Sequence, residues 1–252
     1  MPPMGYRQIA AALRAAIDAG EHPPGSRLPT EAELAAEYDV SRETVRRALA
    51  VLKAAGLVTT ATSQGTVVAR PPVRVRLAHY ATAADPDRPG RDLGPWETAC
   101  AEQGVTSRVE VTGVDRVPAP EQVAELLGLP AGSEVVRRGR RMFAGEDLAQ
   151  VQESWVPADV AAGTPLERPE KLVGGLYAAL TAAGVELAAA TEEVAGRGPT
   201  AEEQDLLGLP EAGTVLEVWR VTRDRTGRAV EVLHTVSDIR RVARVYEDLP
   251  IG

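Results

Sequence analysis

Three arginines lie close together near the start of a predicted helix at residues 42–55. Arg42, Arg46 and Arg47 project from its first turns, on the side opposite its apolar residues. A guanidinium group at this end of a helix can donate two hydrogen bonds to O6 and N7 of guanine, or bind a phosphate. A solvated basic face is the commoner explanation for a few arginines on a helix, so the surrounding elements must decide between the two.

The surrounding sequence predicts a helix-turn-helix that presents these arginines. Apolar residues recur at helical spacing from Tyr6 to Ala19, and Thr30 opens a capping box that begins a short second helix. Ser41 caps the arginine-bearing helix and Gly56 ends it. Two helices joined by a turn of about three or four residues place the second one in the major groove of DNA.

A predicted hairpin follows the third helix. Residues 57–60 and 66–68 read as strands joined by a turn at 61–65, which is the order of a winged helix, whose wing reaches an adjacent minor groove or phosphate. Residues 1–70 hold 8 Lys and Arg against 7 Asp and Glu, whereas the rest of the chain holds 20 against 29. Contact with nucleic acid is therefore expected in the first segment, although the whole chain has a net charge of -8.

These residues resemble a known family. The run Val40-Ser41-Arg42-Glu43-Thr44-Val45-Arg46-Arg47-Ala48-Leu49, with residues 24–35 and 65–68, is similar to the DNA-binding domain of GntR-type transcription regulators. The resemblance covers about residues 6–69 and implies that the recognition helix contacts DNA through Arg42 and Arg46, with the wing tip at 63–65 near the minor groove. The candidate DNA-binding residues are Arg42, Glu43, Thr44, Arg46, Arg47, Thr30, Ser41, Gln64 and Gly65.

A second set of residues, in the remaining chain, is suited to ligand binding. Strand alternation places Arg138 and Arg140 on one face of a predicted strand and Arg137 and Arg141 on the other. Burial of arginine is costly unless it is paired, so an inward pair implies a bound anion or an internal carboxylate. Glu231 is the candidate carboxylate partner, and an internal salt bridge without any ligand remains an alternative.

An internal repeat organises this part of the chain. Leu126-Leu127-Gly128-Leu129-Pro130 recurs 80 residues later as Leu206-Leu207-Gly208-Leu209-Pro210. Each copy ends a predicted helix and is followed by a strand, a polar turn and another strand, at 134–143 and 148–156 in the first copy and at 214–222 and 229–237 in the second. We expect one domain of duplicated halves around a mostly antiparallel sheet, and an α+β fold for the whole chain.

The repeat resembles one branch of the GntR regulators. Together with Gly174-Gly175-Leu176-Tyr177 and Gly227-Arg228-Ala229-Val230-Glu231, it is similar to the effector domain of the HutC branch, called UTRA, over about residues 93–250. The resemblance implies a chorismate-lyase-like fold that binds small molecules, with Glu231 touching the effector. The first amides of a helix at 175–183 point toward the same region as a usable anion site, although sugar-phosphate-binding relatives carry serine where Gly175 stands. The candidate effector-binding residues are Arg138, Arg140, Glu231, Gly175 and Tyr177.

We therefore expect a DNA-binding domain at 1–70, a linker at 71–92 and an effector-binding and dimerisation domain at 93–252. The predicted function is ligand-responsive regulation of transcription, most simply repression, by a homodimer on palindromic double-stranded operator DNA. The effector is a small molecule, anionic if the inward arginines bind it.

Other classes of function are less well supported by the residues. The histidines His22, His79 and His234 have no zinc-ligand spacing, and no catalytic pair, cofactor motif or metal site is expected. One cysteine, no secretory leader and no apolar run of about 18 residues predict a cytoplasmic protein that does not enter a membrane. Two alternatives remain, a chorismate-lyase-like enzyme with a DNA-binding appendage and a constitutive DNA binder whose second domain binds no ligand.

Overall fold

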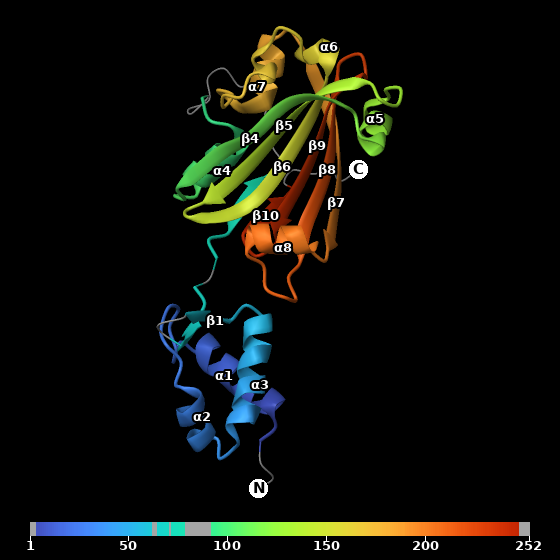
Figure 1. Cartoon of the computed structure of the whole chain (residues 1–252). Helices are drawn as coiled ribbons and strands as arrows, with labels where there is room; N and C mark the ends of the chain where they lie inside the picture. The colour runs from blue at the N-terminus through green and yellow to red at the C-terminus, as the bar shows by residue number, and fades with distance from the viewer. Residues whose placement is uncertain (1–3, 62–64, 71, 79–91, 247–252) are drawn as a thin grey trace, which may run out of the picture. The chain divides into compact units, whose positions relative to one another are not determined.

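The computed structural model describes residues 4–61, 65–70, 72–78 and 92–246 (Figure 1). The chain divides into two compact units. The first comprises Met1–Pro72 with Gly198–Gly213, and the second comprises Val73–Arg197 with Thr214–Gly252. No helix in the described ranges is both long enough and apolar enough to cross a membrane.

The amino-terminal part is a winged helix-turn-helix, as predicted. Its elements are α1 (Tyr6–Asp18), α2 (Glu31–Glu37), α3 (Arg42–Ala54) and the antiparallel hairpin of β1 (Val58–Ala61) and β2 (Gly65–Val68). One side of each helix is apolar and packs into a shared core, because burying such a face stabilises short helices that are marginal alone. The core residues include Ile9, Leu13, Leu34, Val45, Leu49 and Leu52.

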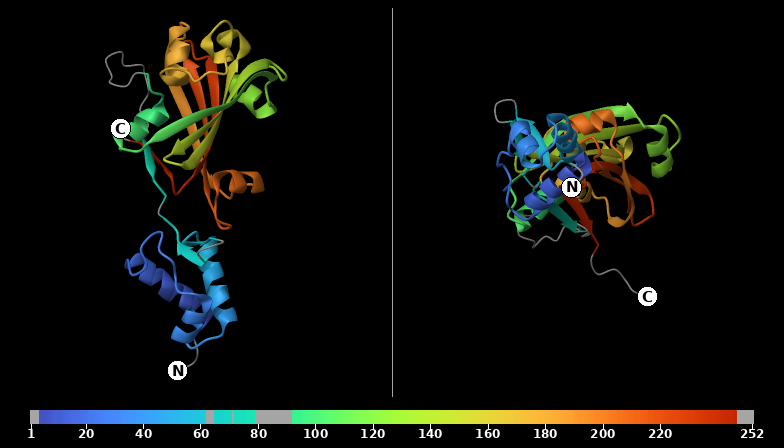
Figure 2. Two further views of the ribbon diagram at one scale, coloured as in Figure 1. Left: turned by 60° about the vertical axis from the view of Figure 1, so that its left-hand side comes forward. Right: turned by 90° about the horizontal axis from the view of Figure 1, so that it is seen from below.

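The second unit is built on a six-stranded antiparallel sheet in the order β4-β5-β6-β9-β8-β7, whose twist can be followed in Figure 2. The strands are β4 (Ser107–Pro118), β5 (Glu134–Ala144), β6 (Asp147–Pro157), β7 (Leu187–Arg197), β8 (Val215–Asp224) and β9 (Ala229–Asp238). The order is symmetric about the β6–β9 pair, which agrees with two duplicated halves. Each half begins with a strand that the sequence pattern did not reveal, β4 in one and β7 in the other.

The repeated Leu-Gly-Leu-Pro motifs end two equivalent helices. α5 (Glu121–Leu127) and α8 (Ala201–Leu207) stop at Gly128 and Gly208, which adopt the left-handed conformation with φ of 68° and 60°. Glycine adopts this conformation without a steric penalty, so both helices can end there. The motif therefore predicted a local structure that occurs twice.

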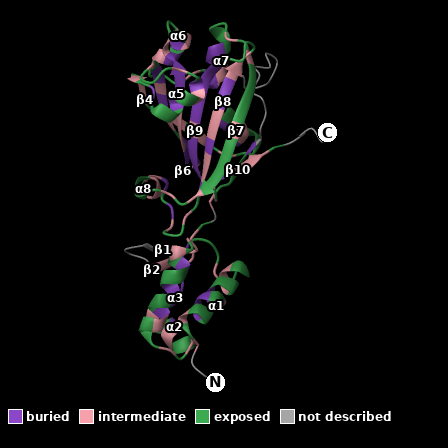
Figure 3. Ribbon diagram, turned by 90° about the vertical axis from the view of Figure 1, so that its right-hand side faces the viewer, coloured by how far each residue is buried: buried purple, intermediate pink, exposed green. Residues whose placement is uncertain are grey.

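The two faces of the sheet carry different residues. The inner face is defined here by Arg138, Arg140 and Gln152, and the outer face by Trp155 and Val232. α5 packs against the outer face, whereas α7 (Gly175–Ala182) packs against the inner face beside α6 (Ala158–Ala161) and the 3-10 helix η1 (Pro165–Glu167). β7 lies at the sheet edge and is largely exposed (Figure 3).

A small parallel pair completes the inner side. β3 (Val75–Ala78) pairs with β10 (Val242–Val245), and their valines pack with Trp96 and Cys100 of α4 (Pro95–Glu102) and with Met142. Burial raises the pKa of the Cys100 thiol to about 11. β3 is thus fixed to the second unit by apolar contacts on one side and by a strand ladder on the other.

Candidate functional site

Polar caps fix the start of α3. The Ser41 hydroxyl accepts a hydrogen bond from the Thr44 amide at 3.2 Å, and the Thr30 hydroxyl accepts one from the Glu33 amide at 3.3 Å. Between the two helices Asp39 has φ of 50°, a left-handed conformation that aspartate tolerates better than most residues. Thr30 and Ser41 therefore shape the helix-turn-helix, and their contact with DNA remains a prediction.

The three arginines of α3 are exposed but differ in their partners. Among the described residues, the Arg42 side chain forms no hydrogen bond or ion pair. Arg46 donates to Glu43 at 2.8 Å and lies 3.4 Å from Glu31, while the Arg47 guanidinium lies 4.3 Å from the centre of the Tyr6 ring. Exposed ion pairs contribute little free energy, so a phosphate can replace the carboxylates on Arg46. Arg42 is the side chain most ready to receive a new partner.

The wing is described only in part. Gly65 has φ of 75°, and a Cβ there would lie 3.4 Å from the Arg27 side chain, so the turn favours glycine. Gln64 lies outside the described residues. Its predicted contact with DNA, like that of Gly65, remains a prediction.

A cavity of about 270 Å³ opens on the inner face of the six-stranded sheet. β3, α4, α7 and β10 contribute the other walls. The apolar part of its lining consists of Leu77, Pro95, Trp96, Ala99, Met142, Leu176 and Leu233. The polar side chains that concern binding are Arg140, Gln152, Tyr177, Arg220, Glu231 and Arg244. Three of the five predicted effector-binding residues, Arg140, Tyr177 and Glu231, therefore share one cavity.

Strand register explains why these residues converge. Arg140 on β5 lies opposite Gln152 on β6, and Glu231 on β9 lies opposite Thr222 on β8. Directly paired residues point to the same face of a sheet. The alternation that places Arg140 on the inner face therefore brings side chains from four strands into one cavity.

Arg140 is largely unsatisfied by protein groups. Its Nη2 donates to the Ser154 hydroxyl at 2.8 Å, and its buried Nε has no partner in the described structure. Burial lowers the pKa of Arg140, against the opposing effect of Glu231 and Tyr177. Glu231 is only 2% exposed and accepts a hydrogen bond from Thr222 at 3.0 Å, but it forms no ion pair with Arg140. The cavity thus holds opposite charges that do not touch each other.

Two other cavity arginines, Arg220 and Arg244, share one carboxylate. The Arg220 Nε donates to Glu192 Oε1 at 2.6 Å, and Arg244 Nη1 lies 3.4 Å from the same oxygen. Arg220 also donates to the Tyr177 hydroxyl at 3.2 Å. Burial raises the pKa of Glu192, but the two arginines outweigh it and hold that pKa below its ordinary value. Arg220 and Arg244 are therefore committed to an internal network.

Arg138 is also buried, but backbone carbonyls and not a carboxylate bind its guanidinium group. Its guanidinium donates to three backbone carbonyls, of Leu166 at 2.7 Å, of Arg168 at 2.5 Å and of Glu170 at 2.8 Å. Burial and the nearby Arg140 lower its pKa to about 10. The expected anion or carboxylate partner is thus wrong for Arg138, because carbonyl dipoles satisfy it instead.

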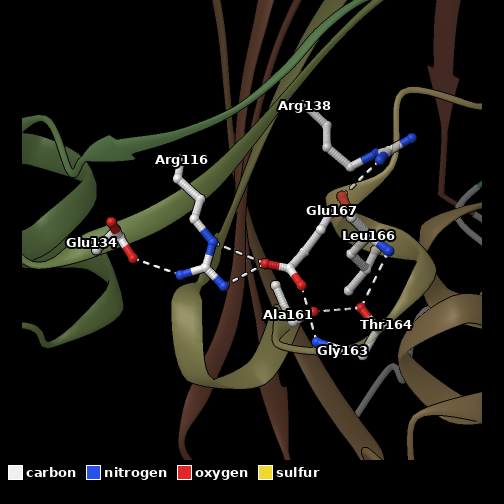
Figure 4. A network of polar contacts seen from close by, with 8 residues as sticks. All are labelled: Arg116, Glu134, Arg138, Ala161, Gly163, Thr164, Leu166 and Glu167. Carbon is white, nitrogen blue, oxygen red and sulfur yellow. Dashed lines mark hydrogen bonds and ion pairs between the residues drawn. The ribbon is translucent and has the colours of Figure 1, made fainter.

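The segment that Arg138 binds is held by a second network (Figure 4). Arg116 binds both Glu134 and Glu167, and Glu167 also accepts from the Gly163 amide at 2.9 Å. This segment leads into α7, which places Leu176 and Tyr177 in the cavity wall. The geometry favours a structural role for Arg138, and its predicted contact with an effector has no support from these contacts.

Gly175 lies beside the main cavity, not in its wall. It lines a void of about 40 Å³ together with Arg138, Arg140 and Lys171. Its φ is 84°, and a Cβ there would lie 3.2 Å from Pro95 Cδ and 3.3 Å from Gly94 Cα. Close backbone packing with Gly94 and Pro95 therefore explains this glycine, and effector binding by its amide remains a prediction.

Sequence reasoning missed part of the cavity. Arg220 is the equivalent of Arg140 in the repeat and lines the same cavity, but it was not among the predicted effector-binding residues. That equivalence was a usable signal. Gln152 and Arg244 gave no such signal, because Gln152 is an ordinary polar residue on a strand and Arg244 lies on the short β10, far along the chain.

Comparisons with known proteins agree with both parts of the fold. The family model of bacterial regulatory proteins of the gntR family matches residues 5–68, and that of the UTRA domain matches residues 102–242. An uncharacterized HTH-type transcriptional regulator of Streptomyces coelicolor is 33% identical over 96% of this chain and 91% of its own length. The chain belongs to the GntR family.

Two further relatives extend this result. A GntR-family transcriptional regulator of known crystal structure matches with a TM-score of 0.67 and 30% identity over 98% of both chains. The HTH-type transcriptional repressor NagR of Bacillus subtilis is 25% identical over 90% of this chain and 87% of its own length. This GntR-family protein is therefore a transcriptional regulator with a DNA-binding domain and a UTRA domain, and its assignment to the HutC branch remains a prediction.

Proposed function

We propose that this GntR-family protein is a ligand-responsive regulator that binds a palindromic operator as a homodimer, and that a small molecule in the inner-face cavity changes its affinity for DNA. The observation that carries the proposal is the position of β3. This strand begins at Val75, five residues after Arg70, where the predicted DNA-binding domain ends, and its Arg76 and Leu77 form part of the cavity wall.

The contacts of β3 support this coupling. Gln103, which caps the end of α4, accepts a hydrogen bond from the Arg76 amide at 3.0 Å and donates one to the Arg76 carbonyl at 2.9 Å. A ligand that moves α4 therefore also moves the strand that leads to the DNA-binding domain. Such a ligand shifts DNA affinity only by its differential affinity for the two arrangements.

The direction of regulation is proposed to be repression. The Bacillus subtilis relative is a transcriptional repressor by name, and the other relatives are transcriptional regulators, which also supports a role without catalysis. A homodimer agrees with recognition of a palindrome, since two-fold symmetry of the protein matches that of the site. Sedimentation of the full chain tests the dimer, and a monomer at micromolar concentration contradicts it.

The DNA-binding part is tested with duplexes selected from a random pool by the full chain. Fluorescence anisotropy then gives the affinity for the selected duplex over a range of salt concentrations. Arg42→Ala should weaken binding by ~1–3 kcal/mol and relax base preference at one position of each half-site. Arg14→Ala, which removes the same charge from the exposed side of α1, is the control. Equal affinities and salt slopes for Arg42→Ala and the wild type would show that the recognition helix is wrongly assigned.

A further inference from the structure

The cavity contains few polar groups that the protein itself does not satisfy. Arg220 and Arg244 bind Glu192, and Tyr177 binds both Thr222 and Arg220. Within the described residues, the side-chain amide of Gln152 has no hydrogen bond, and the guanidinium group of Arg140 has one, to Ser154. Arg76 and Glu102 also line the cavity and have interactions of their own, and in the described structure Arg244 keeps one unpaired Nε beside its contact with Glu192. Arg140, Gln152 and Glu231 are therefore the side chains that we consider as ligand contacts.

The available groups are of opposite character. Arg140 offers a cation and several N–H donors, and Glu231 offers a carboxylate, with no ion pair between them. Buried opposite charges that remain apart leave both incompletely compensated. A ligand that carries an acceptor anion at one end and an N–H donor at the other compensates both, while an anion alone faces repulsion from Glu231.

A phosphorylated ligand fits these groups poorly. Of the three cations that line the small void beside Gly175, Lys171 binds Glu97 at 2.5 Å and Arg138 binds backbone carbonyls, which leaves Arg140 alone for an anion there. That void measures about 40 Å³, and the close approach of Gly94 and Pro95 to Gly175 narrows it. A dianionic phosphate in the main cavity would meet Glu231 with only Arg140 uncommitted.

The cavity is small, and part of its wall is apolar. Its volume of about 270 Å³ lies below the ~300–1,000 Å³ typical of sites for drug-sized ligands. Trp96 of α4 and Leu176 of α7 supply apolar surface to the cavity, and Leu233 supplies it from the sheet beside the polar groups. The space therefore suits a molecule of amino-acid size with an apolar body.

We propose that the effector is a small carboxylic acid of the amino-acid class, whose carboxylate binds Arg140 and Gln152 and whose N–H group binds Glu231. The inference rests on the proposed function, because it names the ligand of that same cavity. Arg140 and Gln152 both donate to the carboxylate, and Glu231 accepts from the nitrogen. Glu231 is then the residue that selects amino acids over simple acids.

The test is a binding screen on the full-length protein. The probes are the common L-amino acids, the corresponding deaminated carboxylic acids, the corresponding amines, glucosamine 6-phosphate and inorganic phosphate. Thermal shift identifies the probes that stabilise the protein, and isothermal titration calorimetry measures their affinities. At least one amino acid should bind more tightly than its deaminated acid and its amine.

Two variants separate the roles of the charges. Arg140→Gln should weaken binding of the amino acid by roughly 100-fold, as expected when one partner of a buried charge contact is removed. Glu231→Gln should weaken binding of the amino acid, whereas the affinity for its deaminated acid should stay unchanged or rise. Arg141→Gln, an exposed neighbour on the outer face of the same strand, is the control and should change neither affinity. Tryptophan fluorescence checks that each variant is folded.

Three results would overturn the inference. The first is thermal stabilisation of the protein by the phosphates alone, and the second is no stabilisation by any amino acid. The third is a Glu231→Gln variant that binds the amino acid and its deaminated acid with equally reduced affinity. Operator binding separates this failure from that of the proposed function. If the chain binds its selected duplex but none of the amino acids, the ligand class is wrong and the regulator stands, whereas failure to select any duplex contradicts the regulator itself.

Discussion

Arg138 and Arg140 are two residues apart on the inner face of β5, yet replacing them with methionine should affect stability very differently. Arg138 is 1% exposed and donates to three carbonyls, whereas Arg140 donates to one hydroxyl. Methionine keeps most of the apolar stem of arginine and removes every donor. The comparison therefore isolates the guanidinium contacts from packing.

The expected magnitudes follow from these contacts. A hydrogen bond to a charged group contributes about 1.5–3 kcal/mol, and the relief of burying a charge offsets part of the loss. Arg138→Met, which leaves three carbonyls without their donor, should lower the free energy of unfolding by about 3–5 kcal/mol. For Arg140→Met, the lost bond to Ser154 and the lost attraction to Glu231 oppose the relief of removing a buried charge. Its stability should stay within about 1 kcal/mol of the wild type.

The assay uses the position of the tryptophans. Trp96, Trp155 and Trp219 are the three tryptophans of the sequence, and all belong to the second unit. Urea unfolding followed by tryptophan fluorescence therefore reports on the unit that contains both arginines, with Arg141→Met as the exposed control. In thermal unfolding the Arg138→Met loss corresponds to about 6–20 °C in Tm. Equal losses for the two inner-face variants would refute the distinction between a satisfied and an unsatisfied arginine.

Three other predictions concern pH, backbone conformation and capping. Burial raises the pKa of Glu192, but Arg220 holds that pKa below its ordinary value of 4.5. The ionised carboxylate therefore stabilises the fold above pH 4.5, and this stabilisation is lost as the pH falls through the lower pKa of the folded state. The stability difference between wild type and Glu192→Gln, measured by urea unfolding at about pH 7 and about pH 3, should shrink at the lower pH; a constant difference contradicts this. Gly175→Ala should cost about 1–2 kcal/mol in the fluorescence assay, because its left-handed φ and the nearby Pro95 both disfavour a side chain, and an unchanged midpoint would show that the backbone relaxes. Ser41→Ala should lower the free energy of unfolding by about 1 kcal/mol through loss of the helix cap, whereas Ser41→Asp, which also caps a helix, should not. Far-UV circular dichroism measures this loss, because the tryptophans do not report on that domain.

Local features of this protein could be predicted from sequence. The capping box at Thr30, the cap at Ser41 and the left-handed glycines at 128 and 208 act over a few residues, so their hydrogen bonds are encoded within each short segment. Strand alternation likewise assigned Arg138 and Arg140 to one face and Arg137 and Arg141 to the other, because side chains along a strand alternate with a period of two.

The partners of those side chains were decided by the tertiary structure. Arg138 was expected to meet an anion or a carboxylate, but it binds carbonyls of the segment at 166–170, about 30 residues away in the sequence. Glu231 was the candidate carboxylate partner of the inward arginines, but Arg140 and Glu231 face one cavity without forming an ion pair. Arg220 lines the same cavity because β8 pairs with β9 in a register that places Arg220 opposite Leu233 on the inner face.

The sequence by itself determined the helices of the DNA-binding domain, the duplicated halves and the faces of the strands. The tertiary structure alone decided which buried charges are satisfied and which remain available to a ligand. The reason is that caps and alternation depend on neighbouring residues, whereas compensation of a buried charge depends on whichever distant segment the folded chain brings within hydrogen-bonding distance.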